Sequence, residues 1–509
     1  MSTNETQSWG SRWGFIISAI GMTIGTGAMW RFPRVAAMYG GMPFMIALII
    51  ALFTWSIPIL MFEAYLGKTT RVGLIASITK TIGKKFTWLG TCYAWITVFL
   101  TAYYIVVFGW TIRYLAYAVM GTITTGVDTD ALWIQFSTGS YNMVIWWLIG
   151  LAACVGIIYK GDSSGIEKLS KVVMPLWLVL IVALMIRAIT LPNGTEGIKY
   201  LFLDDWAAFK NPTMWLEAFT QCVWQAAPGL GLMHSYAIYM SKDEDISLNC
   251  TLVPFSVTSA ALLCGMTVVP TIFALSPDPM GAIASGNTGM TFIHLTKLFT
   301  VITGGRYLSI MFFLALVIAA YTSSISMVEM TTRIIQDAGV ERKKAIAYAG
   351  IVLLVLGIPS ALDINFLNNQ DWVYGVGVLI SGLLLAVAAI KIGLGKIWDE
   401  NIGPCSDLNV PYIFKNIYLV PFLFVAIMGM WAYSTIQSYP GEWMRWLPVS
   451  KYTYSFGTLL YQWAFMFVVA FATNGFVAKL MSRGARVQQH FNDNVCGEEE
   501  EEVAVNVEN

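Results

Sequence analysis

The stretch GMTIGTGAMWRFP, residues 21–33, interrupts an apolar segment that is long enough to cross a lipid bilayer. Lipid offers no partners for free backbone N–H and C=O groups, so a membrane-spanning helix is expected to be continuous. Here three glycines are followed by Arg31 and Pro33. An unwound span is tolerated where its bare backbone lines a cavity and binds something there. The stretch therefore predicts a binding site within the membrane and favours a transporter.

The composition of the whole chain also indicates a membrane protein. Of its 509 residues, 57% are hydrophobic and only 12% are charged, and the mean hydropathy is +0.65. A soluble domain carries about twice that share of charged residues. The net charge is zero, which favours neither nucleic acid nor an acidic substrate as a partner. The seven cysteines show no metal-binding spacing, and most lie in apolar runs, where a cysteine is usually a small core residue.

Apolar segments of about 20 residues, the length that spans a bilayer, occur twelve times. They lie at residues 13–38, 42–67, 88–120, 143–160, 166–190, 214–240, 247–276, 306–336, 344–361, 371–395, 413–436 and 453–481. Lysine and arginine follow the even-numbered segments, whereas residues 121–141 and 363–371 contain neither. Because positively charged loops stay in the cytoplasm, both termini are predicted to be cytoplasmic. The short loop after the third segment favours a bacterial inner membrane.

A second interruption, QAAPGLG at residues 225–231, lies in the sixth segment. Taken alone, a proline followed by two glycines also fits a simple kink. Breaks in segments one and six, however, are the first members of two consecutive five-segment sets, as in inverted repeats with a site between broken helices. We predict a cytoplasmic tail (1–12), a twelve-helix transporter domain (13–481), and a disordered acidic cytoplasmic tail (482–509). Within that domain we predict repeat one (13–190), repeat two (214–395) and two extra helices (413–481).

Several strings resemble the neurotransmitter:sodium symporter family, whose best-known bacterial member carries leucine. They are GxxxGxGxxxRFP at 21–33, the pair Tyr103-Tyr104, Gly165 followed by nine residues and Pro175, SYAIYMSKDEDI at 235–246, and YTSSIS at 321–326. The resemblance implies an all-α fold of two inverted five-helix repeats plus two helices, with helices one and six broken. It also implies a secondary transporter, not an enzyme, that works by alternating access driven by sodium.

The resemblance implies one complete sodium site between helices one and eight. Its positions here are Gly21, Ile24, Ala319, Thr322 and Ser323. A hard cation prefers oxygen ligands, and unwound carbonyls supply them without buried charge. The family's other sodium site is lost, because its positions are Ala28, Val257 and Gln225. The chloride site is also lost, since Leu48 and Ala261 leave only Gln221. These residues predict transport with one sodium ion and no chloride.

The matching positions also predict a pocket for a neutral, hydrophobic amino acid, with a small-molecule substrate and the bilayer as partners. Gly25 leaves room for the substrate carboxylate, and amides near Thr26 and Gly27 favour an anion. Tyr104 is expected to donate to that carboxylate. Gln225 is expected to donate to it in place of the missing ion, unless the substrate departs from a simple α-amino acid. The remaining lining residues are Leu100, Trp224, Ala227, Leu230, Ser323 and Met327.

Charged and aromatic residues near the two ends match the family's gates. Arg31 and Asp371 match the outer gate, and Trp9, Tyr239 and Asp337 match the inner gate. The usual N-terminal arginine is replaced by Thr6. A substrate sensor or channel on the same scaffold, or a proton-coupled carrier using His234 or Glu329, remain alternatives. The sequence also allows a homodimer.

Overall fold

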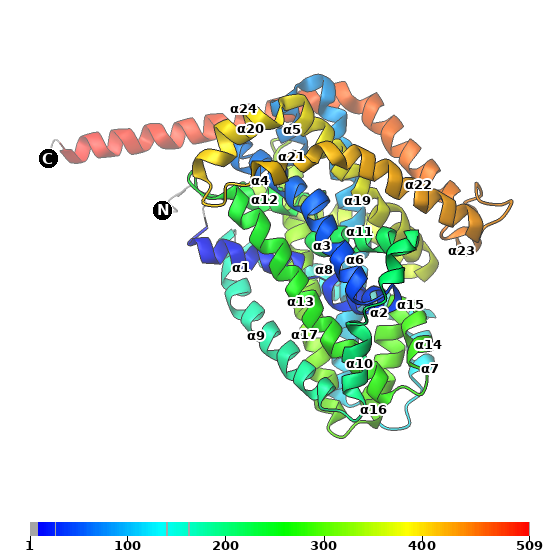
Figure 1. Ribbon diagram of the computed structural model, residues 1–509. Helices are drawn as coiled ribbons and strands as arrows, with labels where there is room; N and C mark the ends of the chain where they lie inside the picture. Colours follow the sequence, from blue (N-terminus) through cyan, green and yellow to red (C-terminus); the bar gives the residue numbers. More distant parts are fainter. Residues whose placement is uncertain (1–8, 26, 139–140, 161–162, 508–509) are drawn as a thin grey trace.

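The computed structural model describes residues 9–25, 27–138, 141–160 and 163–507, and consists of helices and their connections (Figure 1). These ranges contain no β-strand. The apolar segments are helical because a backbone in lipid must satisfy its hydrogen bonds within the segment. The long helices are α6 (Thr87–Met120), α8 (Asn142–Lys160), α9 (Ser163–Ile189), α13 (Ile246–Leu275), α17 (Gly305–Gln336), α18 (Arg342–Leu362), α19 (Ile364–Ile392), α22 (Val420–Ser438) and α24 (Phe456–Val507).

Shorter helices complete the bundle. The second apolar segment contains α3 (Met42–Ala51), the wider turn η2 (Leu52–Ser56) and α4 (Ile57–Thr70). The others among the described residues include α5 (Leu74–Ile82), α7 (Thr129–Thr138), α10 (Gly194–Leu201), α14 (Pro279–Ala284), α15 (Gly286–Thr288), α16 (Thr296–Val301), α20 (Leu394–Ile397), α21 (Pro411–Lys415) and α23 (Val449–Tyr452).

Within the described residues, ten helical segments are long and apolar enough to cross a membrane. An eleventh span is formed by α1 (Arg12–Thr23) together with the turn η1 (Gly27–Arg31) and α2 (Phe32–Met38), which are bent by 51° relative to α1. The predicted break in the first span is therefore confirmed. The bend brings bare backbone to the middle of the bundle.

The sixth predicted span is divided into α11 (Pro212–Ala226) and α12 (Leu232–Ala237), and each half alone is too short to span a bilayer. Between them Ala227 has φ of 57°, and Gly229 and Gly231 have φ of 89° and 76°. A left-handed backbone is unfavourable for most side chains and easy for glycine. The glycines that follow Pro228 therefore make a true interruption of the helix.

Two parts of the chain differ from the sequence prediction. Asp363 is the only residue between α18 and α19, so most of the loop predicted at 363–371 is the first turns of α19. The Asp363 side chain accepts a hydrogen bond from Asn365 N (2.8 Å) and caps that helix. At the other end, α24 continues to Val507 and projects from the bundle (Figure 1), where a disordered tail from residue 482 was predicted. Extending an existing helix needs no new nucleation, and glutamate is a good helix former.

The packing of the helices places the two breaks side by side. Helix α6 lies at the centre and packs against α17, α8, α19 and α18. Helix α1 packs against α9 and α17, and η1 packs against α13 and α11. The two final long helices, α22 and α24, lie at the edge of the bundle (Figure 1). The unwound parts of α1 and α11 are thus enclosed by α6, α13 and α17.

Candidate functional site

The breaks of the first and sixth spans touch through their backbones. Helix α1 ends at Thr23, and Ile24 leaves helical geometry with φ of −71° and ψ of 77°. A Cβ atom placed on Gly27 would lie only 2.7 Å from the carbonyl oxygen of Trp224, near the end of α11. Only a residue without a side chain permits this approach. Gly27 therefore joins the two interruptions into one site.

Gly25 lies against two hydroxyl groups from other helices. A Cβ atom on Gly25 would be 2.6 Å from Tyr104 Oη of α6 and 2.8 Å from Ser323 Oγ of α17. Ser323 Oγ also donates a hydrogen bond to Met22 O (2.8 Å) at the end of α1. Gly25 of the break after α1, Tyr104 of α6 and Ser323 of α17 are thus brought together.

The five residues predicted to bind sodium are all buried in α1 and α17 or directly after α1, and these two helices are packed together. The hydroxyl of Thr322 donates to the carbonyls of Ile318 (3.1 Å) and Ala319 (3.2 Å) within its own helix. In contrast, the Ser323 hydroxyl crosses to α1. Carbonyl and hydroxyl oxygens without buried charge are the ligands that suit a single hard cation.

A chain of polar side chains runs beside this region. Arg31 donates to Glu217 Oε2 (2.5 Å) and to Gln221 Oε1 (2.8 Å). Gln221 Nε2 donates to Gly27 O (3.0 Å) and to Gln225 Oε1 (3.2 Å). Gln225 Nε2 in turn donates to Thr258 Oγ1 of α13 (2.7 Å). The chain connects a charged pair to the unwound carbonyl of Gly27.

This network gives Gln225 partners other than the substrate carboxylate expected for it. Its amide was predicted to donate to the substrate carboxylate, but the amide is fully buried and already bonded to Thr258. Its carbonyl oxygen accepts from Gln221. A buried amide needs partners because an unsatisfied one is costly. Gln225 finds them within the protein and lies outside the cavity walls.

Apart from Gln221 and Gln225, the positions at which the lost ion sites were inferred are filled by apolar side chains. Ala28 and Val257 are fully buried, and so is Ala261, while Leu48 is almost fully buried. None of these side chains offers an oxygen atom. The remaining polar member, Gln221, is engaged with Arg31, Gly27 and Gln225.

A cavity of about 320 Å³ opens above the breaks. Of the predicted substrate residues, Gly27, Tyr104 and Trp224 line it. Thr26 is not among the residues that the structure describes. The other predicted substrate residues do not line the cavity; they are Gly25, Leu100, Gln225, Ala227, Leu230, Ser323 and Met327. The predicted pocket is therefore divided into an open part and a closed, buried part, and the closed part includes the polar side chains of Gln225 and Ser323.

The two residues of the predicted outer gate both line the cavity but do not pair with each other. Arg31 is held by Glu217 and Gln221, whereas Asp371 of α19 is exposed. Glu217, the partner of Arg31, is a further residue that the sequence analysis missed. It stands four residues before Gln221 and eight before Gln225, so the three polar residues share one face of α11. That spacing was a signal in the sequence.

At the opposite end of the bundle, Trp9 closes over α12. Its backbone N donates to Tyr239 O (3.3 Å), its indole Nε1 donates to Tyr236 O (3.0 Å), and its ring packs against both tyrosines. Asp337 is buried with its carboxylate against Gly73, since a Cβ there would lie 2.5 Å from Oδ2. Trp9 therefore contacts Tyr239 directly, and Asp337 lies beside Gly73. Thr6 is outside the described residues.

The Glu329–Arg342 ion pair, which the sequence analysis missed, also lies at this end of the bundle. Arg342 at the start of α18 donates two hydrogen bonds of 2.9 Å to the carboxylate of Glu329. Tyr239 Oη donates to the same carboxylate (3.2 Å). Two parallel hydrogen bonds between arginine and a carboxylate are among the strong ones. Glu329 is thus a fully engaged residue that ties α17 to α18 and to the turn that follows α12.

The interruption between α11 and α12 is held by a buried acid. Glu63 Oε1 of α4 accepts hydrogen bonds from the backbone N atoms of Gly229 (2.6 Å) and Gly231 (3.3 Å). His234, just beyond, shares a hydrogen bond with Val72 O (2.8 Å) through Nε2. Both are buried side chains that satisfy backbone near the break.

Replacing Glu63 by leucine is expected to lower the stability of the folded protein. Two buried amides would lose their acceptor, at about 1–3 kcal/mol for each unsatisfied group. Glu63→Gln retains one carbonyl oxygen at the same place and serves as the control. Thermal unfolding midpoints of the purified variants in detergent measure the effect. Equal midpoints for the leucine and glutamine variants would contradict this role.

Comparison with known proteins agrees with this architecture. The model of the sodium:neurotransmitter symporter family matches residues 6–133 and 127–367. An uncharacterized sodium-dependent transporter of Methanocaldococcus jannaschii is 29% identical, over 92% of this chain and 97% of the relative. A sodium-dependent transporter of Haemophilus influenzae is 28% identical, over 72% of this chain and 83% of the relative.

A solved structure has a similar fold over most of this chain. The crystal structure of MhsT in complex with L-phenylalanine superposes with a TM-score of 0.74 and 26% identity, covering 83% of this chain and 98% of MhsT. This confirms the predicted fold class, in which the first and sixth spans are broken. Because the family model matches well over half of the residues, the chain belongs to the sodium:neurotransmitter symporter family of sodium-coupled membrane transporters.

Proposed function

We propose that this transporter carries a neutral, hydrophobic amino acid together with one sodium ion and without chloride. The observation that carries the proposal is the meeting of Gly25, Tyr104 and Ser323. The missing side chain of Gly25 leaves the Tyr104 hydroxyl at the unwound backbone. That hydroxyl, placed at the backbone of the break, is suited to a carboxylate. MhsT, which has a similar fold, binds L-phenylalanine.

The neutrality of the substrate is supported by the closed part of the site. Leu100, Leu230 and Met327 are buried and apolar. A charged substrate side chain there would lack a partner, and burying an unpaired charge is very costly. A hydrophobic side chain gains free energy from the same surroundings, about 25 cal/mol for each Å² removed from water.

The one-ion stoichiometry is supported by the contrast between the two candidate ion regions. The α1–α17 contact presents carbonyl and hydroxyl oxygens. The other region holds Ala28 and Val257, and the Gln225 amide that lies with them is bonded to Thr258. The chloride positions Leu48 and Ala261 are apolar. A second sodium ion or a chloride ion would have few ligands.

The access pathway follows from the two ends of the molecule. The cavity above the breaks is open, and we infer that it faces the outside of a bacterial inner membrane, with both termini in the cytoplasm. The opposite end is closed by Trp9 and by the Glu329–Arg342 pair. Transport then requires closure of the gap between Arg31 and Asp371 followed by release of Trp9 and the ion pair.

Initial uptake of L-phenylalanine and L-leucine into proteoliposomes tests this function. Uptake should require sodium, should rise with a Hill coefficient of about one, and should persist when gluconate replaces chloride. Choline in place of sodium is the control, and lysine and glutamate should not compete. A coefficient close to two, strict chloride dependence, or uptake driven equally well by a proton gradient would overturn the proposal.

A further inference from the structure

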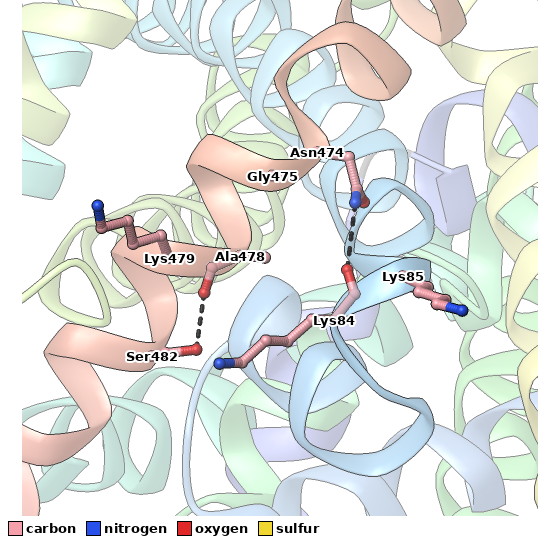
Figure 2. Close-up of a pocket in the computed structure, with 7 residues that line it drawn as sticks. All are labelled: Lys84, Lys85, Asn474, Gly475, Ala478, Lys479 and Ser482. Carbon is pink, nitrogen blue, oxygen red and sulfur yellow. Dashed lines mark hydrogen bonds between the residues drawn. The ribbon is translucent and has the colours of Figure 1, made fainter.

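A second cavity, of about 500 Å³, lies at the edge of the bundle between α24 and the turn η3 (Lys84–Phe86) that precedes α6. Its walls include Lys84, Lys85 and Lys479 together with Asn474, Ala478 and Ser482 (Figure 2). In that view, the Lys84 side chain extends toward the α24 wall, while Lys85 points away from it. This cavity has no part in the amino-acid site, which lies among α1, α6, α11 and α17.

The two walls of this cavity are fixed to each other. Asn474 Oδ1 accepts a hydrogen bond from Trp88 N (2.8 Å), and its Nδ2 donates to Lys84 O (3.2 Å). One side chain thus joins α24 to the beginning of α6. The hydroxyl of Ser482 bonds to Ala478 O within its helix. The lysine stems therefore start from a rigid frame, although their ends can move.

The positive charge in the cavity is not balanced. Lys84, Lys85 and Lys479 are exposed, and no carboxylate among the described residues lies within 4.0 Å of their ammonium groups. By contrast, Lys171, Lys199, Lys344 and Lys451 each pair with a glutamate. Three unpaired lysines around a concave space attract an anion.

The neighbouring surface of α24 is apolar and open. Phe476 is 71% exposed, Val468 66% and Phe471 54%. Phe471 packs on Trp88, with ring centroids 4.4 Å apart. Tryptophan is enriched at the boundary between the hydrocarbon core and the headgroups of a bilayer. The lysines therefore lie where a lipid-facing surface ends, on the side that the lysine-rich segment 68–85 assigns to the cytoplasm.

We propose that this cavity binds the phosphate headgroup of an anionic phospholipid, whose acyl chains lie along the exposed apolar face of α24. Basic pockets between helices on the cytoplasmic side suit such headgroups, and lysines close to the membrane surface attract anionic lipids. The phosphate meets the ammonium group of Lys84, and Lys85 and Lys479, whose side chains point outward in Figure 2, add charge at the rim. A soluble anion gains only the contacts with the lysines, because it has no acyl chains to cover the aromatic surface of α24.

Native mass spectrometry of the purified full-length protein tests this site. Dioleoyl phosphatidylglycerol and dioleoyl phosphatidylcholine, which share their chains, are titrated separately, and inorganic phosphate is used in a third arm. The combined variant Lys84→Gln, Lys85→Gln, Lys479→Gln should weaken binding of phosphatidylglycerol about tenfold or more, as the loss of three such contacts predicts. Lys168→Gln, Lys343→Gln, Lys344→Gln removes the same charge from exposed lysines elsewhere and should change it less than about twofold.

Two further variants separate charge, shape and folding. The triple arginine variant at the three cavity lysines keeps the charge and should keep binding. Gly475→Leu adds a side chain toward open space in the cavity wall, leaves all lysines in place, and should weaken binding. Equal losses in both triple glutamine variants, equal binding of the two lipids, or binding of inorganic phosphate as tight as that of the lipid would overturn the proposal.

Discussion

Replacing Gly25 by alanine is expected to weaken substrate binding and transport strongly while leaving the protein folded. The added methyl group would lie 2.6 Å from Tyr104 Oη and 2.8 Å from Ser323 Oγ, so both hydroxyls must move. Each is the outer end of a side chain and can move without displacing a helix. Overpacking costs about 1–3 kcal/mol, which corresponds to about a five- to 150-fold loss of substrate affinity. Substrate titrations of purified protein measure this loss.

A matched glycine provides the control for that prediction. Gly156 lies within α8, and an added Cβ there meets no atom within 4 Å. Gly156→Ala should therefore bind substrate like the parent protein. Tyr104→Phe removes one of the two displaced hydroxyls and should reproduce about 1.5–3 kcal/mol of the loss, the scale of a hydrogen bond to a charged group. Unchanged affinity in both Gly25→Ala and Tyr104→Phe would place the carboxylate elsewhere.

Removing both hydroxyls of the α17 pair, by Thr322→Val with Ser323→Ala, is expected to eliminate the dependence of uptake on sodium. The double variant leaves only carbonyl oxygens around the proposed ion and also breaks the Ser323–Met22 hydrogen bond that joins α17 to α1. A cation that loses two of its oxygen ligands is bound much more weakly. Initial uptake is measured over a range of sodium concentrations. At sub-saturating sodium, uptake by the double variant should be at least about tenfold lower than uptake by the parent protein, which is equivalent to about 1.4 kcal/mol.

The adjacent serine is the natural control for that experiment. Ser324 is fully buried, and its hydroxyl has no hydrogen-bond partner among the described residues. Removing an unsatisfied hydroxyl is neutral or favourable, so Ser324→Ala should keep the sodium response. If the double variant and Ser324→Ala respond equally to sodium, the coupling ion binds at another place.

The breaks in the helices could be predicted from the sequence because glycine and proline act locally. The stretch at 21–33 and the proline and two glycines after Ala227 interrupt helices wherever they pack, and the structure shows both interruptions. The family and its sodium-coupled transport were also predicted correctly from motif residues. The start of α19 was missed because Asn and Gln in residues 365–370 read as a polar loop, whereas Asp363 caps a helix there.

The side-chain partners were harder to predict, because they depend on which helices meet. Nothing near Gln225 in the sequence indicates Thr258, which lies 33 residues later. The same holds for Arg31 and Glu217, 186 residues apart. The polar face of α11 was visible as a four-residue spacing, but its partner on η1 was not. The division of the pocket into an open and a closed part depends on the conformation of the whole bundle.

The polar chain through Gln225 affects the largest substrate concentration ratio that transport can build across the membrane. A bound ion enters from one side and leaves on the other, and each crossing adds its electrochemical gradient to the driving force. The amide of Gln225 is covalently attached and returns unchanged, so it shapes the site without adding to that force. With one ion, a tenfold sodium gradient supplies about 1.4 kcal/mol, and a membrane potential of about 100 mV supplies about 2.3 kcal/mol more. A transporter that carries two sodium ions in each cycle would have twice that driving force. Under the proposed one-ion stoichiometry, the side chain at position 225 therefore adds nothing to the height of the final substrate gradient.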